Sequence, residues 1–203
     1  MTGLPGEDLF WGRARRALVF DSGLGGLTVL SEIRRLRPDV EIVYVADDAA
    51  FPYGRLGGAE LIARVETVMA RVIADHQPDI VVVACSTAST LRCRACGRPI
   101  PRPCFVERDG RRTDHVVLAC THFPLLIGPL ERAAPWPVAF VDPAPAIARR
   151  LDSLLGAATS GSESLRGAAI FTSGAEPPPS LQKALLRYGL TFTPTAAISL
   201  APA

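Results

Sequence analysis

The segment RALVFDSGLGGLTVLSEIRRLRPDVEIVYVA, residues 16–46, decides the fold class of this 203-residue chain. Four of its first five residues are apolar, and its last six, EIVYVA, are rich in β-branched and aromatic side chains, so both ends predict buried strands. Between them, apolar residues recur at helical spacing from position 27 to position 36 until Pro38 ends the helix. A strand, a helix and a second strand in this order are typical of a parallel sheet covered by helices.

The same alternation continues along the chain and then breaks. After a loop at residues 51–54, a helix with an apolar face at 61–72 leads into a third strand at 80–85. Beyond residue 91 the periodicity disappears over a segment rich in Arg, Pro, Gly and Cys. It resumes with strands at 115–120, 138–142 and 168–173 and helices at 124–132, 146–155 and 181–188. We therefore expect an α/β domain with a parallel sheet flanked by helices, made of residues 17–91 and 115–190, with an irregular junction at 92–114 and tails at 1–16 and 191–203.

Composition and charge limit the classes of function. With 48% hydrophobic residues the chain can bury a substantial core, and its formal net charge of +2 arises from 22 basic and 20 acidic residues spread along the sequence. No basic stripe in the sequence points to a nucleic-acid partner. The sequence has no apolar run that approaches a membrane span and no apolar signal core at its start, so we expect a cytoplasmic protein with reduced cysteines.

Two copies of one pattern carry the clearest functional signal. DIVVVACST at 79–87 and DHVVLACTH at 114–122 align position for position and place Cys85 and Cys120 at the carboxyl ends of predicted strands. Ligands of open α/β sheets bind at that edge, and a helix that begins at Ser86 or Thr87 would favour a thiolate at Cys85. One copy would suit an ordinary buried cysteine. Two copies, each followed by polar residues, favour a site with paired thiols.

The stretch FDSGLGG, residues 20–26, forms the corresponding turn after the first strand. It places Asp21 and Ser22 at the end of that strand, and its glycines let a small anionic ligand approach the backbone. A dinucleotide-binding fingerprint is rejected because Thr28 stands where the third glycine should be. A turn that serves only to pack the following helix stays an alternative for Gly25 and Gly26.

Four separated motifs resemble one known family. FDSGLGGLTVL, PYG, ACSTAS and ACTHFPLL, with FVDPAPAIA and FTSG near the end, resemble the glutamate racemases of the aspartate/glutamate racemase superfamily, which make D-glutamate for peptidoglycan and so serve cell wall biogenesis and cell shape. The resemblance covers most of residues 17–91 and 104–188. It implies an isomerase that racemises the α-carbon of glutamate with two thiols and no cofactor. Independently, the single lysine, Lys183 on a late predicted helix, argues against pyridoxal phosphate, which needs a Schiff-base lysine.

The resemblance also implies which residues form the site. Cys85 and Cys120 would be the two acid/base thiols on opposite sides of the α-carbon, with Asp21 assisting the first and His122 the second. Hydroxyls and backbone amides would hold the carboxylates and the ammonium of the substrate at Asp21, Ser22, Tyr53, Gly54, Ser86, Thr87, Thr121 and His122. A structural role is the alternative for His122, and its place directly after Cys120 and Thr121 favours the site.

The chain departs from this family in two ways. Ser86 stands where the family usually has Asn, which shortens a side chain expected to bind the amino acid head group. Cys85 and Cys120 are 35 positions apart, whereas the family places most of a second lobe, roughly a hundred residues by usual domain size, between them. We therefore expect a racemase-like first lobe with a largely deleted second lobe, and the strand of Cys120 beside the strand of Cys85. An acidic residue that assists the second thiol in the family falls in the lost segment, so it can be assigned to no position here. Because the two thiols must face each other across one α-carbon and most of the second lobe is missing, we expect weak or absent turnover.

Two other functions fit the same residues. A non-catalytic remnant or glutamate-binding protein would keep the site edge without turnover, and a racemase of the same superfamily could act on aspartate or another amino acid. Apolar edges left by the missing lobe favour self-association, for example as a homodimer.

The junction raises a separate question about metal. It contains Cys93 and Cys96, spaced as half of a zinc site or a redox pair, and Cys104 eight positions later. A structural zinc site needs a fourth ligand at suitable spacing, and His115 is a poor candidate. We therefore expect no metal.

Overall fold

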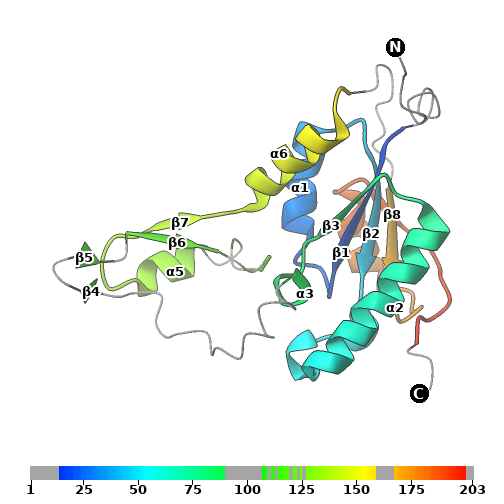
Figure 1. Ribbon diagram of the computed structural model, residues 1–203, viewed down its shortest axis with the longest axis horizontal. Coiled ribbons are helices and arrows are strands. Elements are labelled where there is room, and N and C mark those ends of the chain that lie inside the picture. The colour runs from blue at the N-terminus through cyan, green and yellow to red at the C-terminus, as the bar shows by residue number, and fades with distance from the viewer. Residues whose placement is uncertain are drawn as a thin grey trace, which may run out of the picture.

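The computed structural model describes residues 14–89, 107–108, 111–112, 114–118, 121–122, 124, 127–158 and 167–199. Its centre is a five-stranded sheet in the order β3–β1–β2–β8–β9, in which every neighbouring pair is parallel (Figure 1). The strands are β1 (Arg16–Asp21), β2 (Glu41–Ala46), β3 (Ile80–Val83), β8 (Gly167–Phe171) and β9 (Leu190–Phe192). All five strands point the same way, so their carboxyl ends share one edge of the sheet.

Helices cover both faces of this sheet. α1 (Leu27–Leu36), α6 (Ala144–Leu155) and α7 (Pro179–Leu186) bury apolar residues against one face, and α2 (Gly58–His76) packs on the other. Figure 1 shows α1 and α6 together on one side of the strands and α2 on the opposite side. Side chains alternate along β1, so Val19 belongs to the first core and Leu18 and Phe20 to the second. The expected parallel sheet flanked by helices is confirmed.

One buried arginine fastens α1 to α6. Arg37, which is 3% exposed, donates to the carboxylates of Asp39 and Asp152 and to the carbonyl of Gly156. The hydrogen bonds to Asp39 raise the pKa of Arg37, and the hydrogen bond to Asp152 raises it further. Burial lowers the pKa, but by less than these contacts raise it. The end of α1 is therefore set by this ion pair network as well as by Pro38.

The segment after the junction forms a second, smaller sheet. β6 (His115–Val117) pairs in parallel with β7 (Ala139–Val141), and α5 (Ile127–Ala133) connects them. Inside the region expected to be irregular, β4 (Glu107–Arg108) and β5 (Arg111–Arg112) form a short antiparallel pair. Figure 1 shows these elements together to one side of the main sheet.

The position of β6 differs from the expectation that the strand before Cys120 would join the main sheet. Among the described residues, β3 stays at the edge of that sheet and has β1 as its partner. β6 instead pairs with β7, which supplies three residues in register from His115 with Ala139 to Val117 with Val141. The 115–190 region therefore contributes to two sheets, and its assignment to one domain with residues 17–91 stays a prediction.

The carboxyl-terminal end also differs from the tail expected after residue 190. Leu190–Phe192 forms β9 at the edge of the main sheet, and the following residues return across the ends of the strands. Thr193 donates its backbone N–H to Ala169, and Ile198 donates to the carbonyl of Thr172. Ile198 packs against the core between the sheet and α2, so the segment gains both hydrogen bonds and apolar burial.

Three short helical turns complete the described fold at the carboxyl edge of the strands. Two 3₁₀ turns, Asp48–Ala50 and Tyr53–Arg55, lie between β2 and α2, and α3 (Ser86–Ser89) follows β3. None of the helices formed by the described residues has the length and apolar character needed to cross a membrane.

Candidate active site

A cavity of about 310 Å³ opens at the carboxyl edge of the main sheet. Four separate segments line it: the end of β1, the loop after β2, the residues after β3, and the turn that follows the second cysteine motif. Its lining residues are Asp21, Ser22, Phe51, Pro52, Tyr53, Gly54, Cys85, Ser86, Thr87, Thr121 and His122. Parallel strands bring these segments together because each strand ends at the same edge.

Asp21 provides the buried carboxylate of the cavity. It is 1% exposed, and its Oδ2 atom accepts hydrogen bonds of 3.2 Å from the backbone N–H groups of Gly23 and Gly26. Its Oδ1 atom is buried and has no hydrogen-bond partner among the described residues. A buried carboxylate oxygen in that condition is destabilised until it accepts a hydrogen bond, so Asp21 can bind a cationic donor such as an ammonium group.

Cys85 lines the same cavity and contacts Ser22, the residue that follows Asp21. Its thiol is 4% exposed and donates to the hydroxyl oxygen of Ser22, with the sulfur and oxygen 3.4 Å apart. The helix expected after Cys85 is present as α3, but it is only four residues long. The thiol is therefore held by a side chain from the end of β1, a partner that the order of residues along the chain does not reveal.

Close packing beneath the cavity explains one glycine of the turn. A Cβ atom on Gly26 would lie 3.0 Å from Cβ of Asp21 and 3.1 Å from both Cβ of Ala84 and the hydroxyl of Tyr44. That hydroxyl donates to the carbonyl of Gly23 at 2.9 Å. Burial, followed by the nearby charges of Asp21 and Cys85, raises the pKa of Tyr44 well above its usual value, so it stays a neutral donor that holds the turn.

The second cysteine motif reaches the same cavity through its last two residues. Thr28 of α1 donates its hydroxyl both to the carbonyl of Gly25 at 2.9 Å and to the carbonyl of Thr121 at 3.2 Å. A Cβ atom on Gly25 would lie 2.5 Å from Cε1 of His122 and would also collide with the hydroxyl of Thr121. Gly25 is thus the point at which the glycine turn and the second cysteine motif touch, so its role is not limited to packing the following helix.

The structure brings together most of the residues predicted from the sequence. All nine predicted site residues within the described part of the chain line the cavity: Asp21, Ser22, Tyr53, Gly54, Cys85, Ser86, Thr87, Thr121 and His122. Cys120 lies outside the described residues, as do Cys93, Cys96 and Cys104 of the junction. The roles given to these residues stay predictions, as does the absence of a metal.

Sequence reasoning missed Phe51 and Pro52, which also line the cavity. Phe51 is 58% exposed, so its ring is accessible at the mouth of the cavity. Both residues directly precede Tyr53 and Gly54 in the sequence. This position could have indicated that they line the cavity, because neighbours in the same loop lie close together.

A second cavity of about 500 Å³ adjoins the first and shares Phe51 and His122 with it. Its wall is mainly apolar, from Leu24, Phe171 and Leu181, with the carboxylates of Asp48 and Glu176. Neither cavity is lined by an arginine or a lysine of the described part of the chain. An anionic ligand would therefore be held in the first cavity by hydroxyls, backbone N–H groups and His122, and repelled from the second by its carboxylates.

Known proteins similar to this chain identify its family. The chain is 35% identical to the glutamate racemase of Brucella canis over 260 residues, which covers 88% of this chain and 94% of that protein. The chain belongs to the glutamate racemase family. It is likewise 36% identical to the glutamate racemase of Sinorhizobium medicae, over 85% of this chain and 93% of that protein. No family model matches the chain.

Solved structures of glutamate racemases agree with this assignment. The Escherichia coli glutamate racemase, determined with L-glutamate and the activator UDP-MurNAc-Ala, superimposes with a TM-score of 0.71 at 25% identity, over 92% of this chain and all of that one. The Bacillus anthracis glutamate racemase RacE1 superimposes with a TM-score of 0.68 at 19% identity, over 91% of this chain and 98% of that one, and so supports the fold alone.

This glutamate racemase family member is shorter than its relatives. The alignment with the Brucella canis protein runs over 260 positions but uses only 88% of 203 residues, about 179, so about 80 positions find no residue in this chain. Because the alignment still reaches 94% of that protein, the difference lies inside the aligned region. That the missing positions lie between Cys85 and Cys120 stays a prediction from their spacing.

Proposed function

We propose that this chain interconverts L- and D-glutamate at the 310 Å³ cavity by a cofactor-independent mechanism with two thiols, and so supplies D-glutamate for peptidoglycan in the cytoplasm. One observation carries the proposal. Nine residues predicted from four separate motifs line a single cavity, and an accidental resemblance of short motifs would not bring them to one place.

The first half of the reaction uses Cys85. As a thiolate it takes the α-proton of one enantiomer, so the carbon–hydrogen bond breaks, an S–H bond forms, and the electron pair stays on the α-carbon, next to the substrate carboxylate. The hydroxyl of Ser22, 3.4 Å from the sulfur, can donate to the thiolate and accept from the thiol, which suits a group that alternates between the two states.

The second half needs a thiol on the opposite face of the α-carbon. We assign this role to Cys120, which directly precedes Thr121 in the sequence. Its S–H gives a proton to the α-carbon and leaves a thiolate, so the two sulfurs exchange roles in each turnover and no net proton is consumed. His122 assists this thiol, while Oδ1 of Asp21 accepts a hydrogen bond from the substrate ammonium.

The rate of this reaction is expected to be low. About 80 aligned positions find no residue in this chain, and we place the missing segment between the two thiols because of their short spacing. A misplacement of the thiols by about 1 Å costs on the order of a hundredfold in rate. His122 is exposed, so water reaches this side of the cavity. The missing segment also favours a second candidate function, a protein that binds glutamate without racemising it.

Exposed apolar groups also support self-association. Val83 on the edge strand β3 is 38% exposed and Leu154 on α6 is 57% exposed, and the groove between these two elements is apolar. We propose that two copies associate through this face, which sedimentation across a range of protein concentrations would test.

Exchange of the α-proton in heavy water tests the main proposal. Each glutamate enantiomer is incubated with the full chain in ²H₂O, and deuterium incorporation and inversion are followed separately. The variants are Cys85→Ala and Cys120→Ala, with Cys93→Ala in the junction as the matched control. Inversion that is abolished by either site variant and unchanged in the control is the expected result.

Other outcomes separate the alternatives. Exchange without inversion would mean that one thiol works alone, and binding of glutamate without exchange would identify a binding protein. Faster exchange of aspartate than of glutamate would point to the related racemase. A chain that neither binds nor exchanges glutamate would overturn the proposal.

A further inference from the structure

A buried polar network lies directly behind the loop that lines the cavity. Its centre is Asp47, which follows β2 and is 0% exposed. The carboxylate of Asp47 accepts hydrogen bonds from Tyr53 and Thr172, both at 2.5 Å, and from Nε of Arg64 at 3.0 Å. A second guanidinium nitrogen of Arg64 lies 2.5 Å from the same carboxylate. The charge of Asp47 is thus satisfied by the following loop, by α2 and by Thr172, which is 125 positions away in sequence.

Arg64 links this network to the carboxyl-terminal segment. It lies on α2, is 5% exposed, and donates its remaining terminal nitrogen to the carbonyl of Ile198. Ile198 in turn donates its backbone N–H to the carbonyl of Thr172 at 2.8 Å. The hydrogen bond to Asp47 raises the pKa of Arg64, so this guanidinium stays charged and keeps both contacts.

Tyr53 connects the network to the cavity. It lines the cavity, is 2% exposed, and donates its hydroxyl proton to Asp47. Burial, then the hydrogen bond to Asp47, raises the pKa of Tyr53 far above its usual value, so the hydroxyl stays a donor. Its proton is therefore committed to Asp47, and the loop presents mainly backbone and ring atoms of Tyr53 to a ligand.

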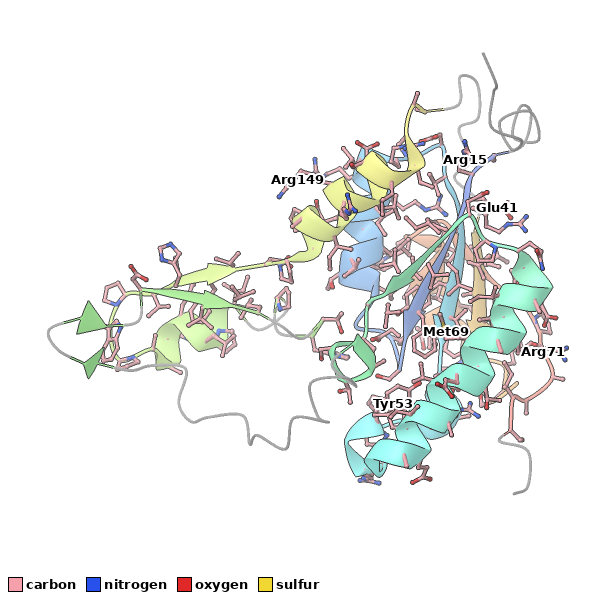
Figure 2. The ribbon with its side chains drawn as sticks, in the orientation of Figure 1. Arg15, Glu41, Tyr53, Met69, Arg71 and Arg149 are labelled. Carbon is pink, nitrogen blue, oxygen red and sulfur yellow. The ribbon has the colours of Figure 1, made fainter. Side chains whose placement is uncertain are left out.

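The first part of the loop has its own attachments, because Asp48 accepts hydrogen bonds from Ser173 and the backbone N–H of Ala49 donates to Thr172. The part that lines the cavity depends mainly on Tyr53. Residues 48–50 include no buried side chain, and Tyr53 is the one buried residue of the turn Tyr53–Arg55. Phe51 and Gly54, on either side of it, are exposed. Figure 2 shows Tyr53 next to the end of α2 at which the loop enters the helix. Fixing Tyr53 thus fixes the backbone of the three residues 52–54 that line the cavity.

Asp47 also touches the opposite wall of the cavity. Its backbone N–H donates to the carbonyl of Asp21 at 2.8 Å, and Asp21 carries the carboxylate assigned to the substrate ammonium. A displacement of Asp47 would therefore move both the loop and the end of β1.

We propose that Arg64 is a positioning residue for glutamate binding, which acts through Asp47 and Tyr53 on the loop at 52–54; this inference rests on the proposed function. The loop lines the cavity and supplies no acid or base to the reaction, so its displacement weakens the ground state and the transition state equally. Such a loss raises KM and leaves kcat unchanged.

The test compares three variants of the full chain. Tyr53→Phe removes only the hydroxyl, and Arg64→Lys keeps the charge but loses the planar donor fork. Arg71→Lys is the matched control, because Arg71 lies on the same helix, points to solvent in Figure 2, and pairs with the exposed Asp75 at 2.7 Å. We expect the KM, or the dissociation constant, of glutamate to rise about tenfold in each of the first two variants, as for the loss of one hydrogen bond to a charged group, with kcat unchanged. The control should stay at the parent value.

A double variant shows whether the two residues act as one unit. Tyr53→Phe combined with Arg64→Lys should weaken binding by much less than the product of the two single effects, since both break the same connection. Independent effects that multiply, or a fall in kcat with KM unchanged, would overturn the proposal.

If the parent chain does not bind glutamate, the proposed function is refuted, but the positioning role of Arg64 can still be tested. Amide hydrogen exchange provides this test. The backbone N–H groups of Phe51, Arg55 and Leu56 are hydrogen-bonded within the loop. Faster exchange confined to a peptide that covers residues 48–57 in Tyr53→Phe and Arg64→Lys would support positioning, when each variant and Arg71→Lys are compared at the same interval below their own thermal midpoints. Unchanged exchange in this peptide, or acceleration spread over the whole chain, would refute it.

Discussion

Replacing Gly25 by alanine tests whether the glycine turn after β1 must touch the second cysteine motif. The added Cβ atom would lie 2.5 Å from Cε1 and 2.7 Å from Nδ1 of His122, and closer still to the hydroxyl oxygen of Thr121. Ordinary van der Waals contact begins at 3.4 Å, so the imidazole must move by about 0.9 Å. The turn that holds Gly25 is anchored by the hydrogen bonds of Asp21 and Tyr44, so His122 and Thr121 are expected to give way.

The two expected effects of Gly25→Ala differ in size. His122 is exposed and can move outward, so the free energy of unfolding should fall by no more than about 1 kcal/mol, the low end of the cost of overpacking. Turnover depends on the relative placement of the two motifs, and a shift of about 1 Å should lower it on the order of a hundredfold. This loss corresponds to about 2.7 kcal/mol of activation free energy, so the function should suffer much more than the fold.

Two measurements on the same samples decide the outcome. The chain has three histidines, so the imidazole signals of His122 can be assigned by nuclear magnetic resonance and compared between the parent and Gly25→Ala. Exchange of the α-proton of glutamate in ²H₂O gives the functional effect. Gly57→Ala is the control, because a Cβ atom there meets nothing within 4 Å. Unmoved His122 signals together with an unchanged exchange rate in Gly25→Ala would refute the contact and the reasoning built on it.

Three further predictions concern stability, pH and metal. Arg37→Ala leaves two carboxylate partners without their buried guanidinium and should lower the free energy of unfolding by about 3–5 kcal/mol, as measured by urea denaturation. Burial, the largest cause, lowers the pKa of His76 below 6.5, so its neutral form contributes stability above about pH 6.5, and this contribution is lost as the pH falls from there through the lowered pKa of the folded state; His76→Gln should flatten the decline between urea titrations at pH 7.5 and pH 5.5. Protein purified without added metal should contain no stoichiometric zinc by elemental analysis, and one zinc per chain would show that Cys93 and Cys96 bind it.

The sequence by itself determined the fold class and, through the resemblance of its motifs to one family, most of the residues that line the cavity. Apolar residues recur at one spacing in strands and at another in helices, and these spacings indicate which residues are buried. The order of the first three strands and two helices follows from them. Asp21, Cys85 and His122 could be predicted because each directly follows a predicted strand or motif, and parallel strands bring such positions to one edge. These are local properties of the chain, so they could be read without the structure.

The tertiary structure alone decided how these residues are held. Periodicity identifies β6 as a strand but does not say that it pairs with β7 and not with β3, because pairing depends on which edges the rest of the chain leaves open. Nor does it show that Arg64 and Ile198, 134 positions apart, meet behind Tyr53. Such contacts join residues whose separation in sequence carries no information about their distance in space, and they form only after the sheet and its helices have packed.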